Sequence, residues 1–211
     1  TNVPGNGRTA HIRDRGMEGA VKVYRAFAEA PLRYITVGHV GPNSVRLAVG
    51  TDRSRGLAVA YSTNANLSAA TTIGTFLVSA AEDYTRSIDI SGLRPDTRYF
   101  YNIMLDGVPY YAAPYPNFRT AVPHGTPGVV RFAFGSCYMG TSAGGYGTVA
   151  LNAPQRADRI WKSIASTGPN FFLHLGDSAY CDNMSAWNLP AYRLVHRHAM
   201  DGRLTNMTAY A

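Results

Sequence analysis

Several features are scarce in this 211-residue sequence, and each absence narrows its function. No run of about 18 apolar residues occurs, so no transmembrane segment is predicted. Lysine occurs only as Lys22 and Lys162, so the net charge of +7 rests almost wholly on arginine. Arginine matches phosphate oxygens well, but a G- and C-rich genome explains such usage equally. These arginines are scattered and form no polybasic run, so no nucleic-acid-binding motif is predicted.

Cysteine is also scarce, since only Cys137 and Cys181 are present. No charged and then apolar leader precedes Thr1. We interpret the chain as a mature protein of extracytoplasmic location, secreted or periplasmic, whose signal peptide is not part of it. Residues 1–33 are assigned to an N-terminal extension with no function implied.

Short alternating segments dominate residues 34–120 and predict an all-β domain. The expected strands cover Ile35 to Val37, Val45 to Val49, Leu57 to Ser62, Ile73 to Val78, Tyr84 to Ile90 and Tyr99 to Leu105. The stretch Leu93-Arg-Pro-Asp-Thr-Arg-Tyr99 is typical of a corner in fibronectin type III-like sandwiches, where a tyrosine hydroxyl bonds nearby backbone. The tyrosine-rich segment from Pro109 to Tyr115 is interpreted as a final strand with exposed rings, in preference to a binding groove.

A proline- and glycine-rich linker, residues 121–128, separates this domain from a second pattern. Val129 to Phe134 and Phe171 to Leu175 predict two buried parallel strands. Between them, apolar residues recur at helical spacing from Pro154 to Thr167 and predict a helix that covers the sheet. They are Ala157, Ile160, Trp161 and Ile164. The unit is therefore βαβ, and the two strand ends should meet at one crevice.

Cys137 follows the first of these strands, and Asp177 and Tyr180 follow the second. Thiolate, carboxylate and phenolate are all anionic, so they share a pocket if a cation lies between them or if some stay protonated. Trivalent iron is favoured because phenolate oxygen is a hard ligand. The second carboxylate oxygen of Asp177 is available to bridge to another ion, as in two-metal sites for displacement at phosphorus.

These motifs resemble a known family. Gly176-Asp177-x-x-Tyr180 after an apolar strand is similar to the second block of the metallophosphoesterases, which include purple acid phosphatases. Gly135-Ser136-Cys137 resembles the PhoD-type alkaline phosphatases and phosphodiesterases, in which this cysteine and this tyrosine ligate iron. The resemblance covers residues 34 to the C-terminus.

The resemblance implies a fibronectin III-like sandwich followed by the first βαβ portion of an incomplete α/β metallophosphoesterase domain, residues 129–211. It implies metal-dependent hydrolysis of a phosphate monoester or diester, with Asp177 as the metal bridge. Cys137, Asp177 and Tyr180 would bind Fe³⁺, and a second divalent ion would be Ca²⁺, with Zn²⁺ or Mn²⁺ as alternatives. The family's later ligand blocks would lie beyond Ala211. We therefore expect the remaining part of the catalytic domain, in the same or a cleaved chain, as a partner, and we expect this chain alone to be inactive.

Two other interpretations remain open. Cys137 and Cys181 both fall at strand ends on the same edge of the predicted sheet, which suggests a disulfide in an exported, structural fragment. A disulfide does not explain why Asp177 and Tyr180 converge on the same crevice. In the second interpretation, the protein is a non-catalytic binding module that uses the surface of the sandwich. His174, inside an apolar strand, is expected to face the packing between sheet and helix.

Overall fold

The computed structural model describes residues 2–5, 8–11, 31–137 and 154–177. A short antiparallel hairpin lies near the start of the chain, with strands β1 (Asn2–Gly5) and β2 (Arg8–His11). The sequence did not predict this hairpin.

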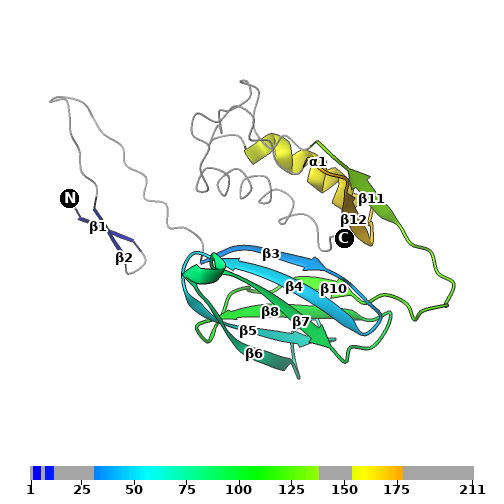
Figure 1. The fold of residues 1–211 in the computed structure, drawn as a ribbon, viewed down its shortest axis with the longest axis horizontal. Coiled ribbons are helices and arrows are strands. Elements are labelled where there is room, and N and C mark those ends of the chain that lie inside the picture. Colours follow the sequence, from blue (N-terminus) through cyan, green and yellow to red (C-terminus); the bar gives the residue numbers. More distant parts are fainter. Residues whose placement is uncertain (1, 6–7, 12–30, 138–153, 178–211) are drawn as a thin grey trace.

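A β-sandwich follows, and its two antiparallel sheets are visible as two layers in Figure 1. One sheet has the order β3-β4-β7, with β3 at Leu32–Gly38, β4 at Ser44–Thr51 and β7 at Thr85–Ser91. The other has the order β10-β8-β5-β6. Its strands are β5 (Arg55–Ser62), β6 (Thr71–Val78), β8 (Arg98–Leu105) and β10 (Asn117–Arg119), and the short β9 (Val108–Pro109) also pairs with β8. A 3₁₀ turn at Ala80–Glu82 leads into β7. The predicted sandwich and its strands are confirmed.

The sandwich core is formed by alternating residues of both sheets. From β4 come Val45, Leu47 and Val49, none more than 1% exposed, and β8 contributes Ile103 at 0%. This period of two is what a half-buried antiparallel strand requires. The two sheets therefore pack together around one hydrophobic core.

The predicted corner is present. The hydroxyl of Tyr99, at the start of β8, accepts a hydrogen bond from the backbone N–H of Arg94 at 2.9 Å. Its ring stacks on Phe118 of β10 with centroids 5.7 Å apart. The corner thus ties the loop before β8 to the edge of the same sheet.

The edge strand that ends the sandwich is broken, which corrects the prediction for the tyrosine-rich segment. β9 and β10 pair with opposite ends of β8, and the side chain of Asn102 bridges the gap by bonding both the N–H and the C=O of Tyr111 at 2.9 Å. Tyr110 and Tyr111 are half-buried and pack against the core. Their rings are therefore part of the sandwich and are not exposed on a regular strand.

A βαβ unit follows, with β11 at Phe132–Gly135, helix α1 at Pro154–Ser166 and β12 at Phe171–His174. β11 and β12 are parallel, and Phe132 is opposite Phe171. Trp161 and Phe172 are buried against each other, with ring centroids 4.9 Å apart. The predicted order of elements is confirmed, although nothing here assigns the unit to a metallophosphoesterase domain.

Three details of this unit differ from the prediction. Val129 and Val130 precede β11 and are 89% and 59% exposed. Ile160 of α1 is 55% exposed, so the buried stripe of the helix centres on Trp161 and Ile164. Phe132 and Phe134 are 53% and 64% exposed, so only one face of the strand pair is covered. The apolar runs were read as strands buried on both faces, whereas one face here meets solvent.

Candidate functional site: the ends of two parallel strands

The register of the two parallel strands is fixed at the residues that precede them. The Asn170 side-chain oxygen accepts from the backbone N–H of Arg131 at 2.9 Å, and the Asn170 N–H donates to the carbonyl of Arg131 at 2.7 Å. A one-residue slip would break both bonds. At the other end the N–H of Leu175 donates to the carbonyl of Gly135 at 2.8 Å. The chain segments that leave β11 and β12 therefore begin next to each other at the same edge of the sheet.

Both segments turn sharply at the same level. Cys137 has φ +57°, Gly176 has φ +114° and Asp177 has φ +49°. A left-handed conformation costs a non-glycine residue about 1–2 kcal/mol, and surrounding structure must hold it there. Seven other described non-glycine residues also have positive φ, so Cys137 and Asp177 are candidates because their turns lie at the ends of neighbouring strands.

The turns bring Cys137 and Asp177 together, as the sequence predicted. The thiol Sγ of Cys137 lies 3.5 Å from Oδ2 of Asp177, and both side chains are exposed. At this distance the thiol donates a weak hydrogen bond to the carboxylate. When both groups are deprotonated, the same geometry presents two adjacent anions to solvent and so suits a cation.

His174, the last residue of β12, contacts the same turn. Its Nδ1 accepts a hydrogen bond from the backbone N–H of Gly176 at 3.2 Å. Its ring meets Phe172 edge to face with centroids 6.0 Å apart. It also borders a hollow of about 130 Å³ between α1 and the strand ends, whose lining includes Trp161, Ile164 and Ser136. The prediction that His174 faces the packing of helix and sheet is confirmed, but its bond to the turn was not anticipated.

The described residues fit part of a metal site. A thiolate and a carboxylate at 3.5 Å are compatible ligands for iron or a similar ion, and both face solvent. Among the described residues, no group of three or more histidine, cysteine, aspartate and glutamate side chains could hold a metal. Tyr180, the third predicted ligand, and Cys181 lie outside the described residues. Cys137 is a free cysteine in the structure.

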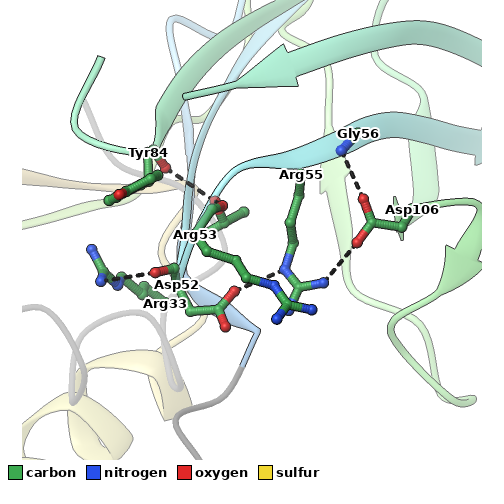
Figure 2. Close-up of polar contacts among 8 residues, drawn as sticks. Arg33, Asp52, Arg53, Arg55, Gly56, Tyr84 and Asp106 are labelled. Atoms are coloured by element: carbon green, nitrogen blue, oxygen red, sulfur yellow. Dashed lines mark hydrogen bonds and ion pairs between the residues drawn. The ribbon is translucent and has the colours of Figure 1, made fainter. Parts of the chain in front are cut away.

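A second polar cluster, at one end of the sandwich, serves its stability (Figure 2). The buried Arg55 donates to Oδ1 of Asp52 at 2.8 Å and to Oδ2 of Asp106 at 2.7 Å. The N–H of Gly56 also donates to Asp106, and this bond, followed by Arg55, lowers the pKa of the Asp106 carboxyl. The cluster links the turn before β5 to the turn after β8 through one guanidinium that bonds two carboxylates.

Tyr101 of the sandwich is buried and Tyr111 is half-buried, and the environment of each disfavours the phenolate form. Burial raises the pKa of Tyr111 to about 12, with a smaller contribution from Tyr110, and burial raises the pKa of Tyr101 as well. Their hydroxyls therefore stay protonated at neutral pH.

Sequence reasoning missed two residues that shape the site. Asn170 sets the strand register, and His174 holds the turn that carries Asp177. For Asn170 a signal existed, because asparagine directly before an apolar strand and after Gly168-Pro169 is suited to bonding backbone. For His174 no such signal exists in the sequence, since the contact depends on how the turn closes.

The described residues form a β-sandwich followed by a βαβ unit, in which a thiol and a carboxylate lie at the strand ends. A solved structure of PhoD matches the fold of this chain with a TM-score of 0.65 and 15% sequence identity. The match covers 89% of this chain and 39% of the PhoD chain, so this chain spans well under half the length of that protein. At this identity the similarity concerns the fold alone.

Two fibronectin structures match a smaller part. The FN1–FN3 domains of chicken CNTN1 give a TM-score of 0.32 at 14% identity, covering 43% of this chain and 31% of theirs. A fibronectin type III domain from the human KIAA0970 protein gives 0.32 at 11% identity, covering 47% and 78%. No protein-family model matches the sequence, and no curated protein matches it.

Proposed function

We propose that this chain carries the first part of a metal-dependent phosphoesterase, which hydrolyses a phosphate monoester or diester. The observation that supports the proposal is the approach of Cys137 Sγ to Asp177 Oδ2 at 3.5 Å, at the exposed carboxyl ends of two parallel strands. Ligands in open α/β sheets bind at such strand ends. The PhoD-like fold over 89% of the chain is consistent with it.

Cys137 and Asp177, with Tyr180, would hold Fe³⁺, and the other oxygen of Asp177 would bridge to a second divalent ion. Calcium is our first choice for that ion, with zinc and manganese as alternatives. When bound, such a pair of ions supplies Lewis acidity toward phosphate oxygens and offsets the charge that develops during displacement at phosphorus. The chain's own contribution is to orient the ligands: the register bonds of Asn170 and the left-handed turns keep thiol and carboxylate facing each other at the solvent-exposed edge.

The substrate and the partner follow from the same proposal. An exposed site at a sheet edge is open to a phosphate ester carried by a larger molecule. The matching structure is more than twice as long as the aligned part, so the remaining portion of the catalytic domain, in the same or a cleaved polypeptide, is proposed as the partner that completes the site. We propose an extracytoplasmic location. In the described residues no helix has the length and apolar character needed to cross a membrane.

Metal analysis of purified wild type and of Cys137→Ser, Asp177→Asn and Tyr180→Phe tests the proposal. We expect about one iron per molecule of the completed protein, and a loss of most of it in each variant, because each substitution removes one anionic ligand. Cys181→Ser is the matched control and should retain the iron. Iron that is unchanged by Cys137→Ser and Asp177→Asn would refute the site.

A further inference from the structure

We propose that His174 is a positioning residue, which holds the Gly176–Asp177 turn so that the Asp177 carboxylate faces Cys137. The inference rests on the proposed function in one respect: the pair that His174 positions is taken to bind a metal ion.

The first step of the argument concerns the hydrogen bonds at the end of β12. The parallel ladder ends with the N–H of Leu175 bound to the carbonyl of Gly135 at 2.8 Å. The next N–H along the chain belongs to Gly176, and it donates to Nδ1 of His174 at 3.2 Å. The His174 side chain thus accepts the first backbone N–H that lies beyond the hydrogen bonds between the two strands.

The second step concerns the turn itself. Gly176 has φ +114° and is followed by Asp177 at φ +49°. The first value lies in a region that is open mainly to glycine, and the second disfavours residues with a Cβ. Two such residues in succession need a local contact to select this conformation from others. The bond to His174 holds the peptide N–H from which the first of them begins, and so anchors the start of the turn that carries Asp177.

The third step concerns the ring of His174. It packs edge to face against Phe172, with ring centroids 6.0 Å apart, and borders the hollow that Trp161 also lines. These contacts with the helix-facing side of the sheet orient the ring. Because Nδ1 accepts from Gly176, the neutral ring carries its proton on Nε2. Residues that orient metal ligands in this way are commonly worth about 10–100-fold in metal affinity.

Two substitutions separate the hydrogen bond from the packing. His174→Phe keeps an aromatic ring against Phe172 but has no acceptor. His174→Asn loses the ring but places Oδ1 at the same number of bonds from the backbone as Nδ1. The probe is Co²⁺, titrated into the completed protein, in which this chain is joined by the remaining part of the catalytic domain. Binding is followed by the thiolate-to-metal charge-transfer absorption, with Cys137→Ser as the control that lacks the thiolate.

We expect His174→Phe to weaken Co²⁺ binding about tenfold or more, and His174→Asn to stay within about threefold of wild type. The reverse order would mean that only ring packing matters, and it would overturn the inference while leaving the metal site intact. If wild type binds no Co²⁺, or Cys137→Ser binds it as well as wild type does, the proposed function fails and the positioning role fails with it.

A measurement without metal tests the contact directly. In the metal-free chain, the ¹⁵N shifts of the neutral His174 ring should show an unprotonated Nδ1 and a protonated Nε2, and Nδ1 should couple to the Gly176 amide proton. A protonated Nδ1 would overturn the inference whatever the result for metal binding.

Discussion

The sandwich and the βαβ unit bury their apolar residues to very different degrees. Within the described residues, the sandwich core comprises 16 buried hydrophobic side chains drawn from both sheets, whereas that of the βαβ unit comprises Trp161 and Phe172. Seven of the large hydrophobic residues that are exposed lie between positions 129 and 175, while Leu77 and Val108 are exposed on the sandwich. In the part of the chain that the structure describes, the sandwich encloses its core, whereas one face of the β11–β12 pair carries exposed apolar side chains.

The difference shows how stability and chemistry are divided along the chain. The sandwich is stabilised by the burial of its core, and the ion pairs of Arg55 link two of its turns. The candidate site lies in the region with the smaller core, where turns and single hydrogen bonds set the geometry. Substitutions in the two regions should therefore have distinguishable effects.

Trp161→Ala is expected to have the largest effect, because it removes one of the two buried side chains of the βαβ core. Removing a buried tryptophan costs about 3–5 kcal/mol. Amide hydrogen exchange should show lost protection in β11 and β12, with β4 and β8 unchanged. Ile160→Ala, one residue away and 55% exposed, is the control and should change little. Loss of protection in β4 as well would show that the two regions unfold together.

Leu47→Ala probes the closed core in the same way. Leu47 is 0% exposed in the central strand of its sheet, and the cavity should lower the free energy of unfolding by about 2–5 kcal/mol. Urea denaturation followed by circular dichroism measures the change. Leu77→Ala, at a position 67% exposed, should stay within about 0.5 kcal/mol of wild type. Equal effects of the two substitutions would contradict the assigned core.

Tyr99→Phe removes the corner hydrogen bond and leaves the ring stacked on Phe118. Because the Arg94 N–H would lose its partner at 2.9 Å, we expect a loss of about 1–2 kcal/mol in the same denaturation experiment. Tyr115→Phe, in the loop before β10, serves as the control and should be close to neutral. A neutral Tyr99→Phe would mean that the corner contributes packing alone.

Asp106→Asn should have the smallest effect and should show mainly in the pH dependence. The pKa of Asp106 is lowered in the folded state, chiefly by the Gly56 N–H, so its contribution is present above about pH 4 and is lost as the pH falls through the folded pKa. The substitution should lower stability at neutral pH by less than about 1 kcal/mol and make the acid-side loss shallower. Asp89→Asn, in the exposed pair with Arg46, should change stability less at neutral pH. An unchanged acid-side slope in Asp106→Asn would contradict the assigned role.

The sequence was sufficient for the parts of the fold that depend on periodicity. Val45, Leu47 and Val49 alternate, and they form one buried face of β4. The wrong predictions concern residues whose burial depends on which segment pairs with them or packs against them. Val129 and Val130 read as strand, but the pairing of Arg131 with Asn170 begins just after them. Ile160 fits the helical stripe, yet no described element covers its side of α1.

The candidate site divides in the same way. Cys137 and Asp177 were predicted to meet because both follow parallel strands, and they lie 3.5 Å apart. Whether Tyr180 joins them, and which metal ions bind, stay predictions. The contribution of His174 could not have been predicted, because a side chain that bonds the backbone two residues later depends on a turn that periodicity does not encode.

The join between β5 and β6 has a consequence for how copies of this protein behave when crowded. β6 is an edge strand without a charged residue from Thr71 to Val78, and such an edge is a template for a foreign strand. Its pairing with β5 shifts register between Leu57 and Val59, where Gly74 adopts φ +96°. An incoming strand therefore meets a kinked template instead of a straight one. We therefore expect this irregularity to disfavour the addition of a foreign strand at β6.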